Sequence, residues 1–124
     1  MASDYAVQDS ILLSVREDIG INNEDYDAFD STLVRHINSA FFVLSQLGVG
    51  SSIPFTITGA SETWSDFLGQ FDNEEEIEAV KTYISAKVKT AFDPPTNGSH
   101  LEALKSQSAE LEWRLNAAED EAFK

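Results

Sequence analysis

The chain has 124 residues and a mass of 13.7 kDa, the usual size of one domain, and its 42% of hydrophobic residues is enough to form a core. Its formal net charge of −14 would repel phosphate backbones and anionic membranes over any broad surface. The absence of cysteine excludes disulfides, thiol chemistry and cysteine-bound zinc. We therefore expect a single domain over residues 1–124.

The beginning of the chain gives no targeting signal. Residues 1–9 have neither the positive charge nor the long apolar run of a secretory signal, and we expect them to be flexible. No segment approaches the ~20 apolar residues that span a bilayer. We expect a soluble protein that is intracellular during its synthesis.

Two amphipathic helices are predicted in the first half of the chain. The first covers residues 10–19, can be capped by Asp9 or Ser10, and ends at Gly20. After a polar, turn-rich stretch, the second covers residues 29–47 and stops at a glycine. The apolar residues at helical spacing are Leu12, Val15 and Ile19 in the first helix and Phe29, Leu33, Ile37, Phe41, Leu44 and Leu47 in the second.

The helical pattern breaks over residues 49–59, where glycine, serine and Pro54 disfavour a helix. The following residues alternate at period two, which indicates one short strand or an extended arm: Phe55, Thr56, Ile57 and Thr58. A single strand needs a partner, either in a small hairpin or in another subunit. Residues 61–69 then predict one or two helical turns that direct Trp64, Phe67 and Leu68 inward.

The third long helix is predicted to open at Asp72 or Asn73 and to stop before Pro94. Its expected buried stripe is Ile77, Val80, Ile84, Val88 and Ala91. Its first turns carry four acids: Glu74, Glu75, Glu76 and Glu78. We interpret these acids as a solvated helix start that offsets the helix dipole, with an acidic docking patch or a channel lining as the alternative.

The last helix is predicted over residues 99–122, with Ser99 and Glu102 as a capping box, and we expect it to project from the domain. Its apolar residues form a narrow, heptad-like seam typical of a helix that docks on one element: Leu101, Leu104, Ser108, Leu111, Leu115 and Ala118. Trp113 lies off this seam. It is either an exposed anchor for another protein or a cover for the end of the chain's own core.

The predicted fold class is therefore mainly α: a small bundle of about four helices with a short β or extended segment and a long C-terminal helix. We expect no enzyme, cofactor or metal site. His36 and His100 lie on different elements without a metal-ligand spacing, and residues 25–36 lack the glycine and the glutamate of a calcium loop. No spacing selects a catalytic triad or a phosphate loop.

Four segments of the chain carry a shared pattern that extends over residues 11–116. They read HINSAFFVLSQLGVG at 36–50, TWSDFLG at 63–69, AVKTYISAKVK at 79–89 followed by FDPP at 92–95, and ELEWRLN at 110–116. In this order and spacing they resemble the head-tail connector, or adaptor, proteins of long-tailed bacteriophages, which form a ring beneath the portal.

The resemblance implies a helical subunit that assembles head to tail into a ring of about twelve copies. The implied partners are the phage portal protein and the next tail-side connector or stopper protein, while DNA passes through the channel without specific binding and no membrane is contacted. The implied location is the head-tail interface of the virion, after assembly in the host cytoplasm. A net charge of −14 fits a channel that repels phosphate, so that the genome slides through it.

The resemblance also implies contact residues by their position in the fold. Those implied to dock on the portal, from the last helix, are Leu111, Trp113, Arg114 and Leu115. Those implied to contact a neighbouring subunit or the tail side are Phe55, Thr56, Ile57 and Thr58. The candidates for an acidic channel lining are Glu74, Glu75, Glu76 and Glu78.

Two other classes of protein fit part of the sequence. An acidic helical binding module, such as an inhibitor that mimics DNA charge or a cytoplasmic adaptor, would also have this charge and a protruding amphipathic helix. A ring-forming mass or affinity for the portal would distinguish the connector from such a module. A hydrolase or metal-dependent enzyme would need a preorganised pocket of perturbed titratable groups, and no residue pattern indicates one.

Overall fold

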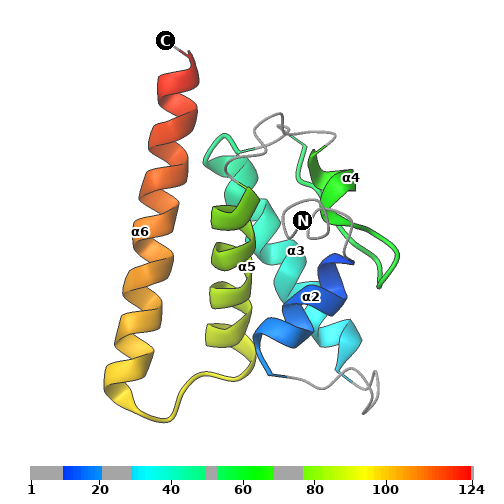
Figure 1. Cartoon of the computed structure of the whole chain (residues 1–124), viewed down its shortest axis with the longest axis vertical. Helices are drawn as coiled ribbons and strands as arrows, with labels where there is room; N and C mark the ends of the chain where they lie inside the picture. The colour runs from blue at the N-terminus through cyan, green and yellow to red at the C-terminus, as the bar shows by residue number, and fades with distance from the viewer. Residues whose placement is uncertain (1–9, 21–28, 50–52, 69–76, 124) are drawn as a thin grey trace.

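The computed structural model describes residues 10–20, 29–49, 53–68 and 77–123, and these residues form a small helical bundle (Figure 1). Its helices are α2 (Ile11–Asp18), α3 (Asp30–Gln46), α4 (Trp64–Leu68), α5 (Ile77–Phe92) and α6 (Gly98–Phe123). The described residues contain no strand, and the mainly α prediction is confirmed. The expectations for residues 1–9 and for a helix start at Asp72 or Asn73 lie outside the described residues.

The first two helices begin and end where the sequence predicts. The Ser10 hydroxyl accepts a hydrogen bond from the Leu13 backbone N–H at 3.2 Å and so caps α2. Gly20 and Gly48 follow α2 and α3 with φ angles of 93° and 87°, a left-handed conformation that glycine adopts without a steric penalty. Phe29 departs from the predicted apolar face: it precedes α3, is 41% exposed, and packs edge-on against Phe92.

Residues 53–58 form an extended segment that lies against α3 without joining a sheet. The Ile57 N–H donates to Asn38 Oδ1 at 2.8 Å, and Asn38 Nδ2 donates to the Ile57 carbonyl at 3.0 Å. One side chain of α3 therefore supplies both hydrogen bonds that a neighbouring strand would supply, and the extended-arm alternative is the one the structure shows. The nearest approach to sheet pairing is an isolated antiparallel bridge between Ser10 and Thr63.

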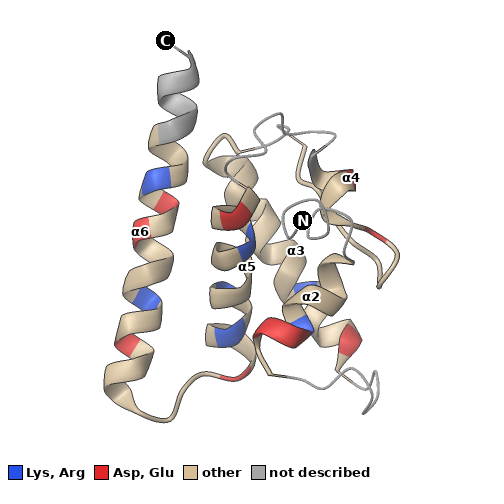
Figure 2. Cartoon of the chain, viewed as in Figure 1, with Lys and Arg blue, Asp and Glu red and all other residues tan. Residues whose placement is uncertain are grey.

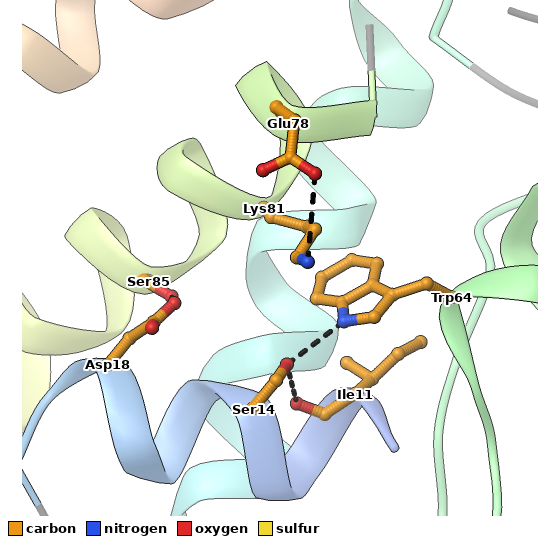
Figure 3. A network of polar contacts seen from close by, with 7 residues as sticks. All are labelled: Ile11, Ser14, Asp18, Trp64, Glu78, Lys81 and Ser85. Atoms are coloured by element: carbon orange, nitrogen blue, oxygen red, sulfur yellow. Dashed lines mark hydrogen bonds and ion pairs between the residues drawn. The ribbon is translucent and has the colours of Figure 1, made fainter. Parts of the chain in front are cut away.

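Four aromatic side chains from the extended segment and from two helices fill the upper part of the core. Phe41 of α3 lies 5.2 Å from Phe55 and 5.1 Å from Phe67 between ring centroids, and Trp64 completes the group. The indole Nε1 of Trp64 donates to the Ser14 hydroxyl of α2 at 2.9 Å, so its polar atom is satisfied in the core (Figure 3). The prediction that Trp64 and Phe67 point inward is confirmed, and the side chain of Leu68 lies outside what the structure describes.

Helix α5 is the central element, because α2, α3 and α6 all pack against it. The predicted stripe of Ile77, Val80, Ile84 and Val88 is buried, but Ala91 is exposed. Tyr83, which the predicted stripe omits, is fully buried on the same helix.

Helix α6 runs antiparallel to α5 along one side of the bundle (Figure 1). The predicted capping box is wrong, because Asn97 caps this helix instead. Its Oδ1 accepts from the backbone N–H groups of Ser99 and His100 at 2.8 and 3.2 Å. The helix begins at Gly98, so Ser99 already lies inside its first turn. No helix in the described residues is both long enough and apolar enough to cross a membrane.

Candidate functional site

The surface of α6 that faces away from α5 is the candidate docking site, and it depends on how firmly α5 holds this helix. Ser108 and Leu115 of the predicted seam are buried, and Leu101, Leu104 and Leu111 are half-buried. The heptad-like seam is therefore the face by which α6 packs on its own subunit.

Polar contacts add to this packing between the two helices. The Tyr83 hydroxyl donates to the Glu112 carboxylate at 2.7 Å, and Lys87 Nζ lies 3.7 Å from the same carboxylate. Burial, and then the hydrogen bond and the negative charge of Glu112, raise the pKa of Tyr83 well above its ordinary value. Asn116 Nδ2 also donates to the Leu47 carbonyl at the end of α3, at 3.0 Å. These contacts fix the rotation of α6 and therefore decide which residues it exposes.

The four candidate portal-docking residues separate into two groups in the structure. Trp113 is 70% exposed, and Arg114 is exposed beside Glu110, with 2.8 Å between its Nη2 and the Glu110 Oε2. Leu111 is half-buried, and Leu115 is only 2% exposed. Trp113 does not cover the core of its own chain. The predicted docking role of Leu115 is corrected. Leu115 occupies the same seam as Ser108, so it packs in the interface with α5 and is not available to a partner on the surface.

The four candidates of the extended segment separate in the same way. Ile57 is 1% exposed and Phe55 belongs to the aromatic group of the core, whereas Thr56 and Thr58 are exposed. Ile57 is therefore corrected to a core residue, since Asn38 ties its backbone to α3 and its side chain turns inward. A partner that approaches this segment meets the two threonines.

Glu62 fixes the turn after the extended segment. Its carboxylate accepts from the Thr58 backbone N–H at 3.0 Å and from the Thr58 hydroxyl at 2.8 Å. Partial burial acts to raise the pKa of Glu62, but these hydrogen bonds, with those from the backbone of Gly59 and of Glu62 itself, lower it below the ordinary value. The turn is thus held by a charged acceptor, and the exposed threonines have a defined position.

The candidate channel acids are only partly within the described residues. Glu74, Glu75 and Glu76 lie outside them. Glu78 is exposed in the first described turn of α5, where Lys81 Nζ lies 3.9 Å from its carboxylate (Figure 3). The same ammonium lies 5.7 Å from the Trp64 ring centroid, so Lys81 turns toward the core and leaves Glu78 facing solvent.

The two histidines lie on different helices. His36 is half-buried on α3, and His100 is exposed in the first turn of α6. Within the described residues, no three side chains of the histidine, aspartate and glutamate types gather into a metal-binding group.

Three exposed apolar residues escaped the sequence prediction, and the first is Leu13 on α2, which is 37% exposed. Phe42 on α3 is 50% exposed, and Ile53 at the start of the extended segment is 74% exposed. The signal for Phe42 is its spacing, because it follows Phe41 directly and therefore falls off the buried stripe of α3. Ile53 lies among turn residues and has no periodic signal.

Comparisons with known proteins give one result. A family model described as phage connector protein matches residues 11–122, which is nearly the whole chain. Neither the curated proteins nor the solved structures contain a match to this sequence.

Proposed function

The chain belongs to the phage connector protein family, and we propose on this premise that it is a structural virion protein that joins the DNA-filled head to the tail. In this proposal it acts by binding alone, without catalysis and without a cofactor or metal. It assembles in the host cytoplasm and is then part of the head-tail interface of the virion.

The proposed assembly is a ring of about twelve copies on the portal, formed by head-to-tail contacts between identical subunits. Its tail-side face meets the next connector or stopper protein. The exposed residues Thr56 and Thr58 are proposed to contact either that protein or the neighbouring subunit, since their backbone is fixed against α3.

The observation that carries the portal contact is the exposure of Trp113. A tryptophan that is 70% exposed leaves a large apolar surface in water, and tryptophan is among the residues most enriched at the energetic centres of protein interfaces. Arg114 beside it adds an exposed guanidinium, whose Nε and Nη2 bond Glu110 and whose remaining N–H groups can bond an acceptor of the partner. We therefore assign portal docking to Trp113 and Arg114, with Leu111 at the edge of the contact.

The channel is proposed to be acidic. A net charge of −14 in each of about twelve subunits gives the ring a strong negative potential, and such a lining keeps DNA moving because phosphate does not adhere to it. Glu78 and the neighbouring acids Glu74, Glu75 and Glu76 are the proposed lining. The alternative, an acidic binding module outside the virion, shares the charge and the long last helix, but it does not follow from membership of the connector family.

Deleting the gene from a phage that encodes this chain tests the proposed function. We expect DNA-filled heads and separate tails in electron micrographs of the lysate, and restored plaque formation when purified protein is added to that lysate. The same addition is made with purified W113A protein, and we expect this variant to restore fewer plaques than the wild-type protein. Intact, infectious virions from the deletion phage would contradict the connector role.

A further inference from the structure

A small pocket with several polar and charged side chains in its lining lies between α5 and α6. Its volume is about 340 Å³, and it is lined by Lys87, Thr90, Lys105, Ser108, Ala109 and Glu112. The pocket exists because the α6 seam has small residues here, where the positions above and below have leucine. No part of α2 or α3 lines it, so only the two helices determine its shape.

Ser108 is a polar residue in a seam that otherwise presents leucines to α5. Its side chain is 5% exposed, and its hydroxyl oxygen is buried with no hydrogen-bond partner among the described residues. A leucine at the same seam position would instead fill the space with apolar contacts. The Ser108 hydroxyl can therefore bond a polar group that enters the pocket, which a leucine at this position could not do.

The charges around the pocket indicate which occupant it takes. Two lysines, Lys87 and Lys105, are part of its lining, and Glu112 offsets the charge of the first, with its carboxylate 3.7 Å from Lys87 Nζ. Lys105 is exposed and makes no ion pair within the described part of the chain. The pocket thus carries a net positive charge in a chain whose total is −14. Figure 2 shows the wider pattern, in which α5 and α6 hold most of the basic residues.

We propose that this pocket binds a carboxylate side chain of a neighbouring copy of the chain, and so forms part of the head-to-tail contact of the ring. This inference rests on the proposed function. A second copy is favoured because it brings 22 acidic residues, and because a heterologous contact joins unlike surfaces of two identical subunits.

The chain also offers a suitable carboxylate away from the pocket. Glu17 of α2 is exposed, and α2 lies on the far side of α5 from α6 (Figure 1). DNA phosphate is the weaker occupant, because the summed charge of the subunit repels a polyanion while a single carboxylate can enter a local positive site.

Charge reversal at the pocket, with a matched reversal elsewhere, tests the proposal. The variant is Lys105→Glu, and the control is Arg35→Glu, which makes the same change at an exposed position of α3. Self-association is measured by sedimentation velocity from about 50 mM to about 500 mM NaCl, and subunits on the purified portal are counted by native mass spectrometry. We expect K105E to weaken self-association by about tenfold or more and to leave incomplete rings on the portal, while R35E matches the wild type.

A second variant separates assembly from folding. Ser108→Ala removes the buried hydroxyl without changing the shape of the seam, and we expect its melting temperature to equal or exceed that of the wild type while its self-association weakens. If Ser108 had only a structural role, the substitution would not weaken self-association while the melting temperature stayed the same or rose.

Three results would overturn the pocket contact. Complete K105E rings, equal to those of R35E, would overturn it and leave the proposed function standing. Loss of duplex DNA binding in K105E with unchanged self-association would identify phosphate as the occupant. A wild-type chain that stays monomeric with and without the portal would overturn both the pocket contact and the proposed ring.

Discussion

Trp113 and Leu115 lie two residues apart on α6, and the structure predicts opposite consequences when each is replaced by alanine. Leu115 is 2% exposed against α5. Leucine-to-alanine changes at buried positions cost about 2–5 kcal/mol of folding free energy. For L115A we expect about 3 kcal/mol, because Leu115 packs against α5 on one side of its helix only. For a domain of this size, that loss lowers the melting temperature by on the order of 10 °C.

Trp113 contributes far less to folding. With 70% of the side chain exposed, roughly 60 Å² remains buried, so W113A costs about 1.5 kcal/mol of folding free energy at most. Its effect on the portal contact is expected to be large, because truncating an aromatic residue at the centre of an interface costs about 2 kcal/mol or more, a loss of about 30-fold in affinity.

The assay compares both variants in two measurements. Thermal unfolding followed by far-UV circular dichroism reports the fold, and biolayer interferometry on immobilised portal rings reports docking at a temperature where both variants are folded. We expect L115A to melt early but to keep its portal affinity within a few-fold of the wild type, and W113A to show the reverse. A W113A protein that melts as early as L115A and still binds the portal would refute the assignment of Trp113 to the surface.

Two further changes test contacts inside the subunit. Asn38→Ala leaves the buried N–H and carbonyl of Ile57 unpaired, so chemical denaturation is expected to show a loss of about 2–4 kcal/mol; a loss under about 0.5 kcal/mol would show that the extended segment does not depend on Asn38. Tyr83→Phe removes the hydrogen bond to Glu112, with an expected loss of about 1–2 kcal/mol at neutral pH. Because the folded state raises the pKa of Tyr83 above 10.0, the unfolded chain loses this proton first, and wild-type stability falls as the pH rises through about 10. Unfolding free energies at pH about 8 and about 11 are expected to differ less for Y83F than for the wild type, and an equal or larger difference would contradict the assignment.

The sequence predicts the helices well where local chemistry determines them. Ser10 caps α2, glycines with positive φ angles end α2 and α3, and the stripe through Phe41 is buried. Phe29 is the exception in that stripe, because it precedes the helix and only its edge meets Phe92. Local signals thus predict the ends of α2 and α3, but they misplace the cap of α6, where Asn97 takes the role expected of Ser99.

The sequence pattern does not predict contacts between residues that are far apart in the chain. A lone asparagine within a helix is usually read as a solvated residue, and nothing local indicates that Asn38 pairs with the backbone of Ile57, 19 positions away. The strand alternative arose for the same reason, since the period-two pattern of this segment does not reveal a side chain as its partner. Tyr83 was missed because its hydroxyl is satisfied by Glu112 on another helix.

The candidate site shows a similar division. The seam spacing already placed Leu115 on the packed face of α6, whereas its docking role came from the resemblance, and the structure favours the spacing. For Trp113 the spacing left both alternatives open, because a residue beside a narrow seam can turn toward either side. The packing of α6 on α5 decides its exposure.

The central claim is that this chain docks on a portal as a ring, and native mass spectrometry of the chain mixed with its portal ring tests it most directly. We predict a discrete complex with about twelve copies on each portal, and no such complex when Trp113 is replaced by alanine. A folded wild-type chain that stays monomeric beside the portal at every concentration would contradict the connector account.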